Sequence, residues 1–97
     1  MGIVRTIHGD VDPASLGVVN AHDHLIRVGA GEVYIDPDHL LIDEDKAVQE
    51  ATSFVDASKR FAPGATIVDM CPASSGRGVL MLRDVVDRVP DLQVIQA

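Results

Sequence analysis

Two histidines, His22 and His24, stand two residues apart at the end of an apolar stretch of the chain. On a β-strand such side chains project from the same face, and a rise of roughly 3.3 Å per residue starts the two rings about 6.6 Å apart. Rings at this spacing can converge on one metal ion, because Zn–N bonds are about 2.0–2.1 Å long. Asp23 projects from the opposite face and is therefore not expected to be a third ligand. The spacing alone leaves a second interpretation open, in which both histidines are satisfied polar groups at the rim of a sheet.

The strand that would carry the two histidines is predicted from Leu16 to His24. Before it, residues 2–7 are expected to form a short strand, and Asp12 is expected to cap one helical turn that Gly17 ends. Regular alternation along the strand places Asn20 on the same face as the histidines. In a barrel this face would be interior, so Asn20 would be a buried amide that needs hydrogen-bond partners.

The rest of the chain alternates between helical and strand patterns. A helical period covers Asp43 to Ala62, with Asp43 as its N-cap, and the β-branched run from Ala65 to Cys71 is typical of a buried parallel strand. A second helix follows, whose apolar face is formed by Val79, Leu82, Val86 and Val89. Leu92 to Ala97 is predicted to be a third strand. The order strand, helix, strand, helix, strand predicts a parallel sheet with right-handed crossovers.

Two further residues with chemically active side chains are given structural roles. His39 lies in a predicted loop over residues 27–43, which includes a brief strand at 32–35, and it is interpreted as a solvated loop histidine. Loops of this kind build the active-site rim when they follow barrel strands. Cys71 is interpreted as a buried small apolar residue, with contact to the site as the alternative.

Four short segments give the chain a family resemblance. It resembles the N-terminal part of a phosphotriesterase-related protein of the amidohydrolase superfamily, in which a Gly-led apolar strand ends in His-x-His. The order and spacing of these segments agree over nearly the whole chain, although Asp23 stands where the family usually has Glu and Gly78 where it usually has Asp. The matching segments are Thr6–Gly9, His22–Leu25, Thr66–Pro72 and Gly76–Gly78.

The resemblance implies a fold class and a reaction. The fold would be α/β, the N-terminal β-α-β-α-β portion of a (β/α)8 TIM barrel, preceded by a short strand or hairpin. Since such barrels need about 250 residues, the barrel is expected to be incomplete in residues 1–97, which would form part of one hydrolase domain. In this family a binuclear centre, with two Zn per complete barrel, activates water to attack a phosphoester or lactone. His22 and His24 would be two of its ligands, and the chain alone is expected to be inactive.

Asp69 interrupts a buried apolar run, where an unpaired carboxylate is costly. The resemblance places it near the mouth of the barrel, where it would accept a hydrogen bond from the second nitrogen of a ligand histidine and orient the ring. The alternative is an aspartate that caps the amides of the following loop.

Composition restricts the partners. A formal charge of −7 argues against nucleic acid and anionic membrane surfaces, and a single cysteine suits a reducing compartment. No apolar run approaches the roughly 20 residues of a membrane span and no secretory segment follows Met1, so a cytoplasmic protein is expected. The resemblance implies a small ester, lactone or phosphoester substrate.

An open three-stranded sheet leaves edges unpaired, so a homo-oligomer or association with the missing barrel portion is expected. Two other hypotheses are a small α/β binding or structural module without catalysis and an enzyme assembled from separate fragments. Metal content separates the binding module from the hydrolase.

Overall fold

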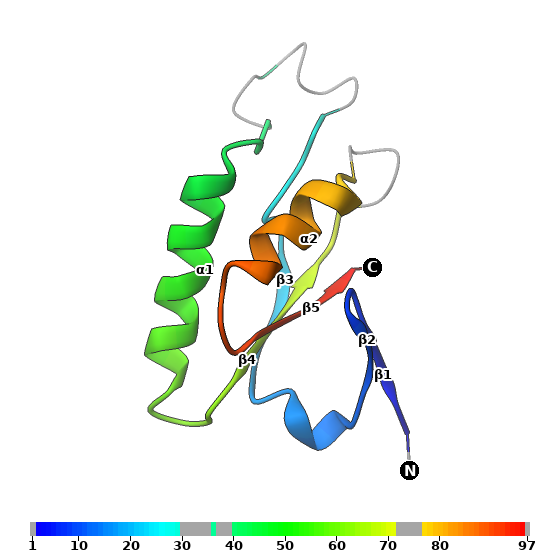
Figure 1. Ribbon diagram of the computed structural model, residues 1–97, viewed down its shortest axis with the longest axis vertical. Coiled ribbons are helices and arrows are strands. Elements are labelled where there is room, and N and C mark those ends of the chain that lie inside the picture. The colour runs from blue at the N-terminus through cyan, green and yellow to red at the C-terminus, as the bar shows by residue number, and fades with distance from the viewer. Residues whose placement is uncertain (1, 30–35, 37–39, 72–76, 97) are drawn as a thin grey trace.

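The computed structural model describes residues 2–29, 36, 40–71 and 77–96 of the 97-residue chain. The predicted strand at 32–35 and His39 lie outside these residues. In chain order, as Figure 1 shows, the elements are two short strands and a 3₁₀ turn, followed by three longer strands that alternate with two helices. Their bounds are β1 Val4–Thr6, β2 Gly9–Val11, η1 Pro13–Ser15, β3 Val18–Asp23, α1 Glu44–Ser58, β4 Ala65–Asp69, α2 Val79–Asp87 and β5 Leu92–Gln96.

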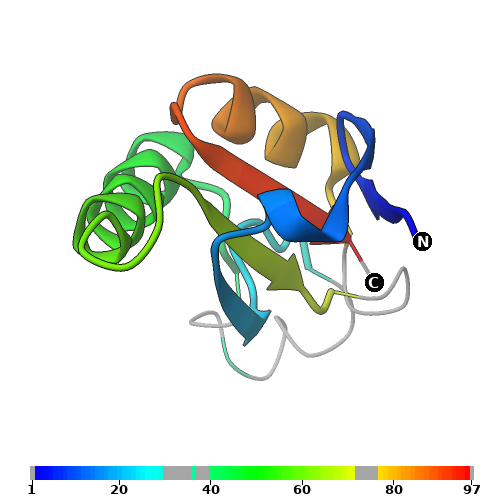
Figure 2. The same cartoon turned by 90° about the horizontal axis from the view of Figure 1, so that it is seen from below.

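The longer strands form a parallel sheet in the order β3-β4-β5. Helix α1 connects β3 to β4 and α2 connects β4 to β5, and both helices cover the same face of the sheet (Figure 2). The predicted α/β alternation and the parallel sheet are therefore confirmed. Because the strands are parallel, the carboxyl ends of β3 and β4 meet at one edge, where Asp23 lies opposite Asp69.

The core lies between the sheet and its two helices. Helix α1 begins as predicted, with the Asp43 side chain accepting the Lys46 N–H, but it ends at Ser58 rather than Ala62. The predicted apolar spacing of both helices directs their buried side chains against the strands. The buried apolar residues of this core include Ala47, Ala51, Val55, Ala65, Ile67, Leu82, Val85, Val86, Leu92 and Val94.

A β-bulge in β3 changes which residues share a face. Asn20 lies opposite Ile67 and Asp23 opposite Asp69, so β3 advances three residues while β4 advances two. The extra residue reverses the alternation, and Asn20 therefore shares a face with Asp23. The prediction of an uninterrupted alternation from Leu16 to His24, which had placed Asn20 on the face of the histidines, is therefore wrong at the bulge.

The segment before β3 is a hairpin that pairs β1 with β2 in antiparallel fashion. The Ile7 N–H donates to the Val94 carbonyl at 2.8 Å and so ties the hairpin to β5. Asp12 caps the following turn as predicted, because its side chain accepts the Ala14 N–H. Within the described part of the chain, neither helix has the length and apolar character needed to cross a bilayer.

Candidate metal centre

His22 and His24 come together where β3 ends. Their ring centroids are 5.4 Å apart and the ring planes meet at 75°. Two imidazoles that each bind one tetrahedral Zn²⁺ through a single nitrogen have centroids about 5 Å apart, given Zn–N bonds of about 2.0–2.1 Å. His22 is exposed and His24 half-buried. The spacing and the chemistry of the two side chains thus fit a shared metal ion.

Hydrogen bonds fix the backbone that carries the two histidines. One carboxylate oxygen of Asp23 accepts the Asn20 side-chain amide at 2.9 Å, and the other accepts the His24 N–H at 2.8 Å. The Asn20 carbonyl oxygen in turn accepts the His22 N–H at 3.2 Å. The bulge is therefore held by side chains of the strand itself, and the Asp23 carboxylate is occupied by these donors.

Asp69 is fully buried at the end of β4. Its Oδ2 accepts the Leu25 N–H at 3.1 Å and its Oδ1 accepts the Cys71 N–H at 3.0 Å. Of the two roles considered for Asp69, these contacts correspond to the capping of loop amides. The carboxylate fastens the segment after β3 to the segment after β4, and it thereby positions His24 next to β4.

We expect Asp69→Asn to lower the free energy of unfolding by about 1–3 kcal/mol. The asparagine side chain has only one acceptor oxygen, so its NH2 group would face one of the two buried N–H groups and leave that group without an acceptor. Urea-induced unfolding measures this loss. Asp12→Asn is a matched control, since asparagine caps a helical turn as well as aspartate does. Equal unfolding free energies for the two variants would contradict the clamping role of Asp69.

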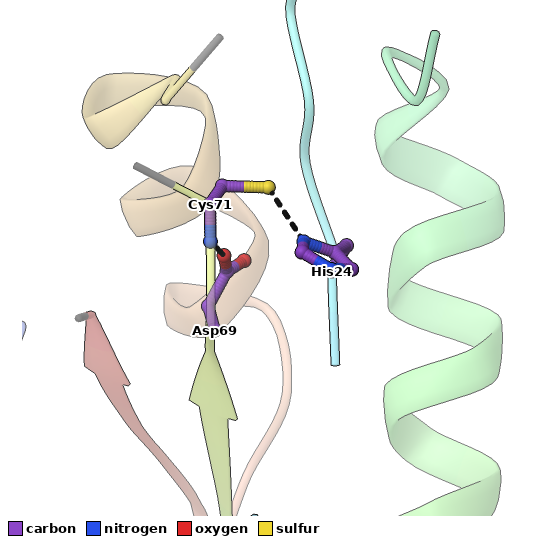
Figure 3. Close-up of side chains that lie close together, drawn as sticks. All are labelled: His24, Asp69 and Cys71. Atoms are coloured by element: carbon purple, nitrogen blue, oxygen red, sulfur yellow. Dashed lines mark hydrogen bonds between the residues drawn. The ribbon is translucent and has the colours of Figure 1, made fainter. Parts of the chain in front are cut away.

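Cys71 is the site residue whose contacts sequence reasoning did not favour. It is buried as expected, but its Sγ lies 2.9 Å from Nδ1 of His24 (Figure 3). Burial raises the pKa of Cys71 to about 11, and the neighbouring Asp69 adds to this rise through its charge and a hydrogen bond to the thiol. One signal was present in the sequence, since Cys71 follows Asp69 by two residues at the edge that β3 and β4 share.

These side chains form a compact group. A nitrogen of His24, a carboxylate oxygen of Asp69 and the Cys71 sulfur all lie within 4.8 Å of one another. Beside them, a pocket of about 420 Å³ opens between the end of β3, residues 40–43 and the first turns of α1. This volume is in the range of small-molecule sites, and His24 contributes to its lining.

Known proteins resemble the chain in sequence over most of its length. A phospho-furanose lactonase from Mycoplasmopsis agalactiae is 39% identical over 84 residues, which make up 87% of this chain and 22% of the relative. A phospho-furanose lactonase from Mycoplasmopsis synoviae is 35% identical over 88 residues, which cover 91% of this chain and 24% of the relative. No family model matches the chain.

Solved structures share the fold of the chain. An amidohydrolase from Mycoplasma synoviae has a TM-score of 0.86 at 33% identity, covering 97% of this chain and 26% of that one. A lactonase from Listeria monocytogenes has a TM-score of 0.85 at 30% identity, and the match covers 98% of this chain and 27% of the lactonase. A phosphotriesterase from Mycobacterium tuberculosis has a TM-score of 0.66 at 26% identity, and the match covers 98% of this chain and 28% of the phosphotriesterase.

The chain spans about a quarter of the length of the proteins it matches. The sequence likeness, the shared fold and the histidine pair at the end of the first parallel strand agree with one another. The chain therefore belongs to the phosphotriesterase-related family of the amidohydrolase superfamily, of which it carries the N-terminal part.

Proposed function

We propose that the protein is a metal-dependent hydrolase of the lactonase type, in which His22 and His24 bind a divalent metal ion. The observation that carries this proposal is the 5.4 Å separation of the two imidazole rings at the end of β3. The curated relatives named lactonases support the choice of reaction. Zinc is the metal we expect, since it binds imidazole nitrogen well and hydrolysis requires no change in the oxidation state of the metal.

The complete site requires more ligands than these residues contain, because catalytic zinc sites use at least three protein ligands. We propose that the whole protein is a (β/α)8 barrel with two zinc ions and that its other strands supply the remaining ligands. The 97 residues alone would be inactive. Exposed apolar side chains, among them Phe61 at 79% and Leu80 at 78%, support packing against further parts of the protein.

The residues of this chain prepare the site for hydrolysis. His22 and His24 would hold the metal at the mouth of the barrel, beside the pocket that His24 lines. When bound, the metal lowers the pKa of water and polarises the electrophilic carbon or phosphorus. The Asn20–Asp23 contact fixes the backbone between the two rings, and the Asp69 clamp fixes the segment that follows them.

The substrate we propose is a phosphorylated furanose lactone, the class that the names of two curated relatives indicate. A phosphotriester is the second candidate, favoured by the likeness to a phosphotriesterase at 26% identity. The alternative to a hydrolase is a small α/β module that has a binding or structural role and catalyses no reaction.

The test uses the protein expressed from its complete reading frame. We expect purified protein to contain close to two zinc ions, to hydrolyse a phosphorylated pentonolactone, and to lose this activity on chelation and regain it with Zn²⁺. A chromogenic phosphotriester is assayed in parallel. Metal-free protein that neither binds Zn²⁺ nor hydrolyses either substrate would reject the proposal in favour of the binding module.

A further inference from the structure

The contact between His24 and Cys71 links the segments that follow two parallel strands at the candidate metal centre. Cys71 Sγ lies 2.9 Å from Nδ1 of His24, although the two residues are 47 positions apart in the chain. Figure 3 shows the sulfur directed at the imidazole ring from the segment after β4. Cys71 is completely buried, so water does not compete for this contact.

The length of the contact indicates a hydrogen bond between the two side chains rather than two ligands of one ion. A nitrogen at about 2.0–2.1 Å and a sulfur at about 2.3 Å from one tetrahedral zinc lie about 3.5 Å apart. The observed N···S separation is 2.9 Å, well below that value. A hydrogen bond to Nδ1 also leaves Nε2, the other ring nitrogen, available to a metal.

The Cys71 thiol has a second partner that decides the direction of this hydrogen bond. Its sulfur also lies within 4.8 Å of a carboxylate oxygen of the buried Asp69, which accepts a hydrogen bond from the thiol S–H. The sulfur lone pairs then remain to accept a hydrogen bond from the Nδ1–H of His24. The chain of donors runs from His24 Nδ1–H to the Cys71 sulfur and from the thiol to Asp69.

We propose that Cys71 is a positioning residue for the metal ligand His24, linking its ring to Asp69 and holding the proton on Nδ1 so that Nε2 faces the metal. This inference rests on the proposed metal-binding function. It gives Asp69 the orienting role that the family resemblance implies, but through an intervening thiol. Groups that orient a ligand histidine typically contribute 10–100-fold to metal affinity, so roughly that loss is expected when the sulfur is removed.

The experiment has one arm on the unaltered protein and one on variants, both made from the complete reading frame. Two-bond ¹H–¹⁵N NMR of the metal-free protein identifies the protonated nitrogen of His24, assigned by the signal that His24→Asn removes. The Co²⁺-loaded protein is examined for thiolate-to-cobalt absorption in the near ultraviolet. Zn²⁺ dissociation constants are then compared for wild type, Cys71→Val and Cys71→Ser.

We expect the proton on Nδ1, no thiolate-to-cobalt absorption, and Zn²⁺ binding about 10–100-fold weaker in Cys71→Val, with Cys71→Ser recovering part of the loss through its hydroxyl. A proton on Nε2, or equal affinity in wild type and Cys71→Val, would overturn the inference. Thiolate-to-cobalt absorption that Cys71→Val abolishes would overturn it in favour of direct ligation. Wild-type protein that binds no metal would reject the proposed function, whereas an Nε2 proton in protein that does bind metal would reject the role of Cys71 alone.

Discussion

His24→Asn is expected to remove zinc from the protein and to lower kcat/KM for lactone hydrolysis by more than about 100-fold. His24 is both a proposed ligand and the ring through which Cys71 and Asp69 act on the site. Loss of a group that merely orients a ligand already costs 10–100-fold in metal affinity or activity, so loss of the ligand itself should exceed that range. Metal analysis after dialysis and steady-state kinetics on the protein from the complete reading frame provide the measurement.

His8→Asn is the matched control for this variant. His8 lies in the β1–β2 turn, and its Nε2 contacts Asp87 at 2.6 Å, at the far end of α2 from the site. We expect full metal content and unchanged kinetics in this variant. His22→Asn should resemble His24→Asn if the two rings share one ion. A His24→Asn protein that is folded, retains its zinc and keeps its activity would remove the basis of the proposed function.

The elements of the fold could be predicted because their signals are local. The apolar spacing from Ala47 to Val55 defines a helix, and Asp43 marks where it begins. The apolar run at Ala65 bounded by a Pro-Gly pair defines a strand in the same way. These patterns depend only on residues within one element, which explains why the strand–helix order and the sheet type agreed with the structure.

The parts of the site that could not be predicted depend on how two strands pair. The bulge between Asn20 and Asp23 is defined by how the residues of β3 pair with those of β4. The sequence of β3 alone predicts side chains that alternate between the two faces without interruption. The contact of His24 with Cys71 depends on that same register, since it joins the segments that follow β3 and β4. The proximity of the two histidines was predictable, because they stand two residues apart in one short stretch of the sequence.

Gly17→Ala is expected to lower the free energy of unfolding by about 3–5 kcal/mol, through backbone strain together with steric overlap. Gly17 has a φ of +67°, a conformation that alanine adopts only at a cost. A Cβ at this position would also lie 2.0 Å from the Gly64 carbonyl oxygen and 2.7 Å from its carbon. Both atoms belong to the backbone, so the turn that leads into β4 would have to move.

The position of Gly17 connects this loss to the metal centre. The Val18 N–H donates to the same Gly64 carbonyl at 3.3 Å, and Val18 then pairs with Ala65 to set the register of β3 on β4. Displacing Gly64 therefore shifts the strand on which the two histidines stand, and metal affinity should fall together with stability.

Variants of two other glycines, measured by urea-induced unfolding, separate the cost of backbone strain from the cost of steric overlap. Gly9→Ala, at φ +123° with nothing within 4 Å of the new Cβ, should show only the cost of backbone strain, about 1–3 kcal/mol. Gly2→Ala has neither a positive φ nor a close neighbour and should change little. If Gly17→Ala were no more destabilised than Gly9→Ala, the close approach of Gly17 to Gly64 would not constrain the protein in solution. The register that brings His24 to Cys71 would then have to depend on the buried strand pairs and the Asp69 clamp alone.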